Sequence, residues 1–205
     1  MSRGRPVADD VPVGNTYNKY ATTNPIERRL MRGFFSALDT ALPATAPRAI
    51  LEVGLGEGEV SRRLAERFPA ARLTGLDLPD PDLAGHWEGG PFSPLFGDIG
   101  ELPFADDTFD LVLAIEVLEH VPDPGLALAE LARVSRQHLV ASVPREPLWR
   151  VANLARGKYL GDLGNTPGHV NHWSKGRFAA LIGSQFDVES VHCPMPWTVV
   201  GARCR

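Results

Sequence analysis

The stretch from Ala49 to Asp77, which reads AILEVGLGEGEVSRRLAERFPAARLTGLD, decides the fold of this 205-residue chain. It opens with a short apolar run that only Glu52 interrupts, as is typical of a buried parallel strand. Residues 60–68 then carry apolar side chains at every fourth position, which predicts an amphipathic helix. Residues 72–76 predict a second strand, which Asp77 closes. Strand, glycine turn, helix, strand and acid together predict one βαβ unit with a ligand site at its open end.

Glycines follow the first strand at every second position, at Gly54, Gly56 and Gly58. A residue without Cβ can turn sharply at a strand end and lets the backbone come close to a ligand. About twenty residues further on, Asp77 stands at the tip of the next strand, where a carboxylate can accept both hydroxyls of a ribose. The unit therefore predicts a nucleoside ligand.

The glycine spacing indicates which nucleoside to expect. A dinucleotide site needs a glycine three residues after the second one, so that a pyrophosphate can sit at the helix N-terminus. Glu59 stands at that position, beside Glu57, and Glu52 adds a further acid before the turn. Carboxylates disfavour a diphosphate, whereas a ligand with cationic groups and no phosphate fits them better. S-adenosylmethionine, with its sulfonium, ammonium and ribose, is such a ligand.

Composition and charge narrow the class of protein further. The formal net charge is −4, so no global basic field recruits nucleic acid or an anionic membrane, and we expect neither as a partner. Cys193 and Cys204 show no metal-site or disulfide spacing, so we expect reduced thiols. Residues 1–14 have no apolar core, and no apolar run of about eighteen residues occurs. These features predict a cytoplasmic protein.

Three motifs resemble those of class I S-adenosylmethionine-dependent methyltransferases. The pattern Glu-x-Gly-x-Gly-x-Gly that starts at Glu52 resembles their first motif. Residues 97–104, GDIGELPF, resemble their Gly-Asp-x-x-x-Leu-Pro-Phe stretch, and residues 116–121, EVLEHV, resemble a segment of small-molecule enzymes related to ubiquinone and menaquinone biosynthesis, the type 11 methyltransferases. The resemblance covers roughly residues 49–143 in motif and the whole chain in element order.

This resemblance implies S-adenosylmethionine as the cofactor and S-adenosylhomocysteine as its product. It implies that Asp98 reaches the adenine amino group, although an Asx turn that caps the loop is the alternative for this residue. The backbone from Glu52 to Gly56 is expected at the methionine end, where Tyr17, Tyr20 or Arg28 could add a contact. The full set of expected cofactor contacts is Glu52, Val53, Gly54, Leu55, Gly56, Gly58, Asp77, Leu78, Asp98, Ile99, Ile115, Glu116 and Tyr20.

The fold expected from this resemblance is a Rossmann-like, doubly wound α/β sheet of seven strands, mostly parallel with an antiparallel last strand. We expect a disordered lead over residues 1–14 and a single methyltransferase domain over 15–205. Within the domain, residues 15–45 form an N-terminal lid or helix, in which Tyr17 and Tyr20 either anchor the helix start or cover the cofactor. Residues 145–173 form an insertion that caps the substrate. The apolar pattern predicts helices from Pro25 and over 60–68, 123–136, 148–155 and 175–182, strands over 49–53, 72–76, 95–98, 109–115, 138–143, 186–192 and 198–204, and a loop-like crossover over 78–94.

The acceptor side is less specified by the sequence. If the nucleophile is a hydroxyl or thiol, a nearby base is needed, and histidine suits neutral pH. His120, His169 and His172 stand in loops at expected strand ends, with a structural role as the alternative for His120. Two histidines without a third ligand at a sensible spacing do not predict a metal site. Aromatic residues suggest a partly aromatic acceptor pocket or, equally, core packing, and they are Trp87, Trp149 and Trp173.

Other functions compete with a small-molecule methyltransferase. Residues 115–118, IEVL, lack the Pro-Pro-aromatic motif of amino-directed nucleic-acid enzymes, and neither cysteine lies mid-chain, as the cytosine-C5 enzymes require. The alternatives that stay open are a non-catalytic protein that binds S-adenosylmethionine as a partner subunit and, with less support, a nicotinamide-dependent oxidoreductase. Monomer and homodimer are equally compatible with the sequence.

Overall fold

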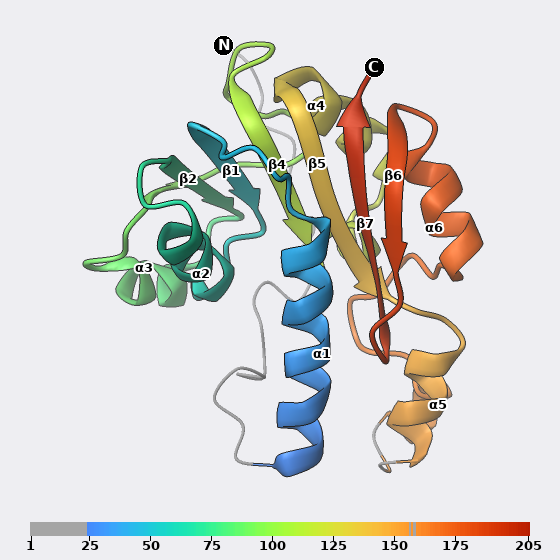
Figure 1. The fold of residues 1–205 in the computed structure, drawn as a ribbon. Helices are drawn as coiled ribbons and strands as arrows, with labels where there is room; N and C mark the ends of the chain where they lie inside the picture. The colour runs from blue at the N-terminus through green and yellow to red at the C-terminus, as the bar shows by residue number, and fades with distance from the viewer. Residues whose placement is uncertain (1–23, 156, 158) are drawn as a thin grey trace, which may run out of the picture.

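A computed structural model of the chain describes residues 24–155, 157 and 159–205 and shows one seven-stranded sheet with helices packed on both faces (Figure 1). The strand order is β3-β2-β1-β4-β5-β7-β6. The first five strands in this order pair in parallel, and β7 is antiparallel to both of its neighbours. The predicted doubly wound α/β fold is confirmed. The strands are β1 (Ala49–Val53), β2 (Arg72–Asp77), β3 (Ser93–Phe96), β4 (Phe109–Ile115), β5 (Ser135–Pro144), β6 (Phe186–His192) and β7 (Trp197–Cys204).

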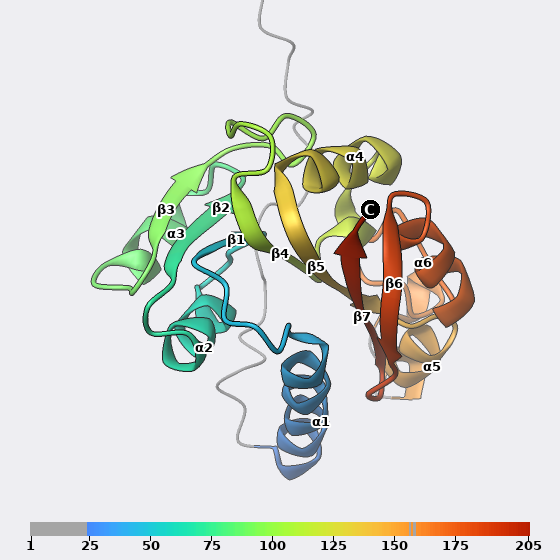
Figure 2. The same cartoon turned by 45° about the horizontal axis from the view of Figure 1, so that its top comes forward.

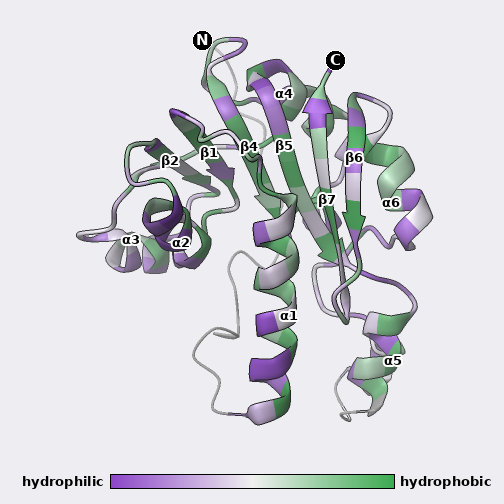
Figure 3. Ribbon diagram, viewed as in Figure 1, coloured by the Kyte–Doolittle hydropathy of each residue, from purple (hydrophilic) through white to green (hydrophobic). Residues whose placement is uncertain are grey.

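Each face of the sheet has its own hydrophobic core. One core joins the sheet to the helices that bear Leu64 and Phe34, and the other joins it to the helices that bear Leu128 and Phe178. In Figure 3 the helix α1 carries its hydrophobic residues along one side. The helices are α1 (Pro25–Ala41), α2 (Glu59–Arg67) and α3 (Pro81–Trp87) on the first face, α4 (Pro124–Val134) and α6 (Lys175–Ile182) on the second, with α5 (Leu148–Ala155) and the short 3₁₀ helices η1 (Leu118–His120) and η2 (Leu160–Asp162) in connections.

The start of α1 follows from its sequence. The Asn24 side chain accepts a hydrogen bond from the Ile26 amide at 2.9 Å, and Pro25 occupies the first turn, where its missing N–H costs nothing. The helix then lies across the sheet with Phe34 buried, and the ring centroids of Phe34 and Trp197 are 5.1 Å apart. The predicted helix from Pro25 is therefore confirmed, and it joins the start of the described chain to β7.

The connection between β2 and β3 differs from the expectation. Residues 78–94 were expected to be loop-like, but they contain the seven-residue helix α3. Asp80 caps this helix by accepting from the Asp82 amide at 2.9 Å, and Leu83 and Trp87, four residues apart, bury its apolar side. The abundance of glycine and proline around it masks a helix of only two turns.

Two strand boundaries also differ. β3 covers residues 93–96 rather than 95–98, so Asp98 lies in the loop beyond the strand. β5 begins at Ser135 rather than at residue 138, since Ser135 pairs with Phe109 across a bulge in β4.

The topology defines where a ligand can bind. The crossovers run from β1 outward to β2 and β3, and then return to β4 on the other side of β1. Ligands of open α/β sheets bind at such a switch point, outside the carboxyl ends of the strands. Figure 2 shows β1 and β4, on the two sides of this switch point, next to each other in the sheet. Within the part of the chain that the structure describes, no helix combines the length and the apolar character needed to cross a bilayer.

Candidate cofactor and acceptor site

The glycine turn folds back over the end of β2. The amides of Gly54 and Leu55 both donate to the Leu76 carbonyl, at 2.8 and 3.1 Å. Gly54 has φ 78°, and a Cβ there would stand 2.2 Å from Val117 Cγ2, so only glycine allows the close approach of the two strand ends. Gly56 has φ 51°, and a Cβ there would meet no atom within 4 Å. The backbone at Gly56 therefore borders open space.

Asp77 reaches this turn from the end of β2. One carboxylate oxygen accepts from the Gly56 amide at 2.6 Å, and the other accepts from the Leu78 amide at 2.8 Å. Burial raises the pKa of Asp77 above its usual value, and the two backbone N–H groups oppose that rise. The structure thus brings the two predicted parts of a nucleoside site, the glycines and the acid, into direct contact.

Trp87 supports the turn from the outside. Its indole Nε1 donates to the Gly56 carbonyl at 2.8 Å, and its side chain is buried in the core under α3. Trp87 therefore does not line an acceptor pocket, which was one of the two expectations for it. Its role is to fix the carbonyl of Gly56 and hence the conformation of the loop.

Glu52 lies beneath the turn rather than at its surface. Its side chain is only 3% exposed and accepts a hydrogen bond from the Ser61 hydroxyl of α2. Burial raises the pKa of Glu52 to about 8, an effect that the Ser61 hydrogen bond reduces and the nearby Asp77 increases. Burial therefore disfavours the negative charge that the sequence predicted at Glu52.

Three other predicted contacts lie at neighbouring strand ends. Asp98 Oδ1 accepts from the Gly100 amide at 2.8 Å, which is the Asx turn considered as its alternative role. The side chains of Ile99 and Ile115 are buried in the two cores. The remaining predicted contacts with apolar side chains differ in exposure, since Val53 and Leu55 are buried and Leu78 is exposed.

Glu116 has a position that the sequence does not reveal. It adopts φ 59°, a left-handed conformation that is strained for a residue with a side chain. Its carboxylate accepts from the Ser142 hydroxyl at 2.9 Å and from Trp197 Nε1 at 2.7 Å. Glu116 thus connects the end of β4 to β5 and β7, and its side chain is directed into the protein.

The structure brings two of the three candidate histidines together. His120 ends η1, directly after β4, and His169 lies in the loop that precedes α6. Their ring centroids are 4.8 Å apart, with the rings nearly perpendicular at 83°. His172 is not part of this pair, because its Nε2 lies 2.7 Å from the Asn165 side-chain oxygen.

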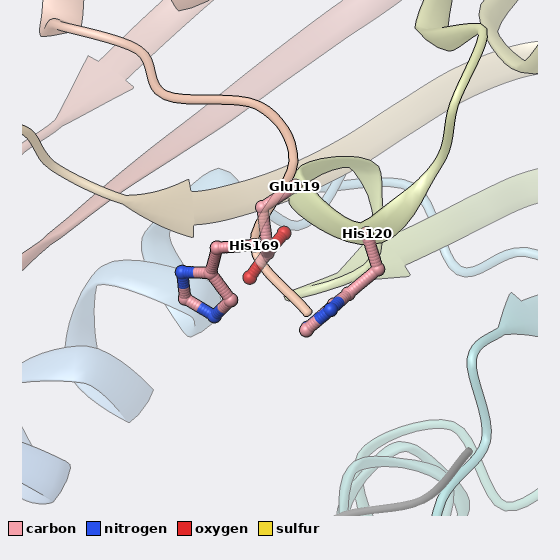
Figure 4. Close-up of side chains that lie close together, drawn as sticks. All are labelled: Glu119, His120 and His169. Carbon is pink, nitrogen blue, oxygen red and sulfur yellow. The ribbon is translucent and has the colours of Figure 1, made fainter. Parts of the chain in front are cut away.

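A residue that the sequence analysis passed over completes this cluster. Glu119 is 2% exposed and lies between the two histidines in Figure 4. One ligand-type atom of each of Glu119, His120 and His169 lies within 4.8 Å of the other two. The signal was present in the sequence, because Glu119 directly precedes His120 after β4, but its proximity to His169 depends on the folded loop.

Backbone hydrogen bonds hold the loop of His169 against η1. The amides of Val170 and Asn171 both donate to the Glu119 carbonyl, at 2.9 and 3.0 Å. The Asn171 side-chain amide donates to the carbonyls of Leu118 and Val121, at 3.2 and 2.6 Å. Hydrogen bonds therefore join two segments about fifty residues apart in the sequence.

The three tryptophans expected in or near a pocket separate into different roles. Trp149 stacks on His169 at a centroid distance of 6.2 Å and donates to the Thr166 hydroxyl at 2.9 Å. Trp173 instead packs against Phe178 at 5.7 Å, beside the core. Trp149 is thus the tryptophan at the histidine cluster. Tyr17, Tyr20, the expected lead over residues 1–14 and the first part of the expected segment 15–45 lie outside the described residues.

Comparison with known proteins shows which family part of the chain resembles. Residues 51–138 match the family model Methyltransf_11, described as a methyltransferase domain. This part of the chain is similar to that family. The chain is 31% identical over 144 residues to the ubiquinone biosynthesis O-methyltransferase of Hahella chejuensis, which covers 66% of this chain and 58% of that protein. It is 37% identical over 93 residues to the malonyl-[acyl-carrier protein] O-methyltransferase of Legionella pneumophila, covering 43% of this chain and 33% of that protein.

One further alignment and two solved structures add to this comparison. Over 103 residues the chain is 36% identical to the demethylmenaquinone methyltransferase of Thermus thermophilus, covering 48% of this chain and 46% of that protein. The chain thus aligns with 33% to 58% of the length of these curated relatives. A methyltransferase from Aquifex aeolicus has the same fold, with a TM-score of 0.69 at 18% identity over 89% of this chain and 94% of that one. Magnesium protoporphyrin IX methyltransferase from Synechocystis, solved with bound S-adenosylhomocysteine, has a TM-score of 0.63 and a sequence identity of 18%, covering 90% of each chain.

Proposed function

We propose that this chain transfers a methyl group from S-adenosylmethionine to a hydroxyl oxygen of a small molecule. The observation that carries the proposal is the contact of Asp77 with the glycine turn, 2.6 Å from the Gly56 amide, beside open space at the Gly56 Cα. An adenosyl group requires a carboxylate for its ribose and a backbone that it can approach closely. Both features lie at the carboxyl ends of β1 and β2, next to the switch point of the sheet.

The residues of the chain would hold the cofactor by its ends. When bound, S-adenosylmethionine supplies a methyl group activated by a positively charged sulfur. Asp77 would accept hydrogen bonds from the ribose hydroxyls, and Asp98 would accept one from the adenine amino group. The backbone of residues 52–56 would hold the methionine end. Because the sulfur loses its charge during transfer, a carboxylate pressed against it would stabilise the ground state and slow the reaction. The chain contributes to the rate mainly by alignment.

The acceptor side is proposed at the cluster of His120 and His169. Two of the relatives are named for transfer to oxygen, which supports an oxygen acceptor here. In the transfer, a bond forms between the acceptor oxygen and the methyl carbon, the carbon–sulfur bond breaks, and the hydroxyl proton leaves to a base or to water. Residues 145–173, which bring Trp149 and His169 to the cluster, are proposed to cover the acceptor.

The nicotinamide alternative is disfavoured by the start of α2. Gly58 is the N-cap of this helix, and Glu59 occupies its first turn, with Glu57 directly before the cap. A pyrophosphate at the N-terminus of α2 would meet these acids rather than backbone N–H groups alone. A protein that binds the cofactor without turnover would have the same turn. Only a measurement of activity therefore distinguishes an enzyme from such a binding protein.

Calorimetric titration tests the cofactor directly. We expect S-adenosylhomocysteine to bind the wild-type chain in the micromolar range, the Asp77→Ala variant to lose most of that affinity, and NAD to bind neither. Asp82→Asn is the control. Asp82 is exposed in α3, and this substitution also removes one negative charge from the segment after β2. Absence of S-adenosylhomocysteine binding by a folded sample would overturn the proposal.

Turnover separates the enzyme from the non-catalytic binder. Transfer of labelled methyl from S-adenosylmethionine is measured against a panel of phenols, quinols and aliphatic alcohols. Methylation of at least one hydroxyl class is expected. A chain that binds S-adenosylhomocysteine and methylates none of them would support the role of a binding partner.

A further inference from the structure

The cluster of Glu119, His120 and His169 has the composition of a metal site. It offers two imidazoles and one carboxylate, and one ligand-type atom of each lies within 4.8 Å of the others. We propose that these three side chains bind one divalent transition-metal ion, with Zn²⁺ strongly preferred over Mg²⁺. The proposal that the ion binds stands on this cluster alone, whereas its role in methyl transfer rests on the proposed function.

The donor set selects the ion. Imidazole nitrogen suits zinc and its neighbours, whereas magnesium prefers carboxylates, carbonyls and water. Two histidines and one glutamate are also a known set for zinc sites that perform catalysis, because three protein ligands leave a coordination position open.

The geometry requires only a small closure. Ligands about 2.0–2.2 Å from a tetrahedral zinc ion stand roughly 3.5 Å from one another. The present separation of up to 4.8 Å therefore exceeds this value by about 1 Å. His120 is exposed and can make the adjustment by side-chain rotation, while Glu119 and His169 are largely buried and already placed.

The surroundings of His120 favour metal binding. Its Nδ1 lies 3.0 Å from the Gly168 carbonyl oxygen, which can only accept a hydrogen bond. The ring therefore carries a proton on Nδ1, and in the neutral ring Nε2 is the nitrogen that can serve as a metal ligand. Histidines that bind metals commonly donate their other N–H to a carbonyl or carboxylate in this way.

The burial of the cluster supports the same conclusion. Glu119 is 2% exposed and His169 is 9% exposed. A carboxylate placed so far from water is costly unless positive charge compensates it. Glu119 already interacts with other groups of the folded chain, and a divalent cation between the carboxylate and the two rings would add a favourable charge. The loop that brings His169 is bonded to the Glu119 carbonyl through Val170 and Asn171, so the ligands are held before an ion arrives.

The ion would act on the acceptor. A hydroxyl that occupies the open position loses its proton more easily, because the cation stabilises the resulting oxyanion. The proton passes to solvent water, the oxyanion forms a bond to the methyl carbon, and the carbon–sulfur bond of the donor breaks. The histidines would then position a metal ion and would not serve as the proton acceptor themselves.

The test is titration of chelator-treated protein with ZnCl₂, and separately with MgCl₂, in the absence of any methyl donor. We expect one equivalent of Zn²⁺ to bind at micromolar or lower Kd, with no saturable Mg²⁺ binding. His120→Ala and Glu119→Gln should each weaken Zn²⁺ binding by at least about 10-fold. His86→Ala, which removes an exposed histidine on α3, should not. Cobalt(II) provides a spectroscopic readout, since bound Co²⁺ should give visible bands that His120→Ala abolishes.

Two results would overturn the proposal: no stoichiometric Zn²⁺ binding by folded wild-type protein, or binding that His120→Ala and Glu119→Gln leave unchanged. His120→Ala is expected to fold, because His120 is exposed. Titration of each variant with S-adenosylhomocysteine separates this proposal from the proposed function. Loss of Zn²⁺ binding with intact S-adenosylhomocysteine affinity supports the metal site, and Zn²⁺ binding without S-adenosylhomocysteine affinity removes only the role in methyl transfer.

Discussion

At the scale of single residues, Glu52 makes a testable contribution to the pH dependence of stability. Burial raises its pKa from 4.5 to about 8 in the folded chain, so between these values the folded state holds a proton that the unfolded state has lost. The contribution of this group to the free energy of unfolding is therefore fully present below about pH 4.5. It falls as the pH rises from there through about 8, by about 1.4 kcal/mol per pH unit at most.

The variant Glu52→Gln isolates this effect, because glutamine keeps the shape and an acceptor for Ser61 but does not titrate. Urea unfolding at pH 5.5, 7 and 8.5 is the measurement. We expect the stability of the wild type relative to Glu52→Gln to fall steadily across this series. Parallel pH profiles for the two proteins would show that Glu52 does not titrate in this range.

At the scale of elements, the contact between η1 and the loop of His169 depends on Asn171. Asn171→Ala removes two side-chain hydrogen bonds, to Leu118 and Val121, and should lower the free energy of unfolding by about 1–3 kcal/mol. It should also weaken Zn²⁺ binding by about 10- to 100-fold while S-adenosylhomocysteine affinity stays within about twofold. Val170→Ala is the control, since the neighbouring Val170 side chain is 58% exposed. Equal Zn²⁺ affinity in both variants would mean that the loop needs no side-chain support.

The elements also show how far the sequence predicts this molecule. The bounds of α1 and α6 could be anticipated, because Asn24 and Ser174 are capping residues whose hydrogen bonds are local. The helix α3 could not, since its seven residues carry too short an apolar pattern. The contact of the glycine turn with Asp77 was predictable, because Gly56 and Asp77 belong to one βαβ unit. The contact of Glu119 with His169 was not, because it depends on hydrogen bonds between segments about fifty residues apart.

At the scale of the whole molecule, α1 and β7 depend on one another. Phe34 is 2% exposed and packs on Trp197, whose indole also donates to Glu116 at the end of β4. Phe34→Ala should lower the free energy of unfolding by about 3–5 kcal/mol in a single cooperative transition. Ile26→Ala on the same helix should change it by less than about 0.5 kcal/mol, because Ile26 is 70% exposed. Urea unfolding followed by tryptophan fluorescence and by circular dichroism measures both, and two separate transitions in Phe34→Ala would contradict a single unit.

The position of β7 has a consequence for how the chain folds during synthesis. This strand follows β6 in the sequence but lies between β5 and β6 in the sheet (Figure 1). While β6 emerges from the ribosome, it has no neighbour with which to form backbone hydrogen bonds, and β5 presents an open edge. Translation must therefore reach β7 before β6 and the free edge of β5 gain their backbone hydrogen-bond partners, and during this interval both can pair with other chains.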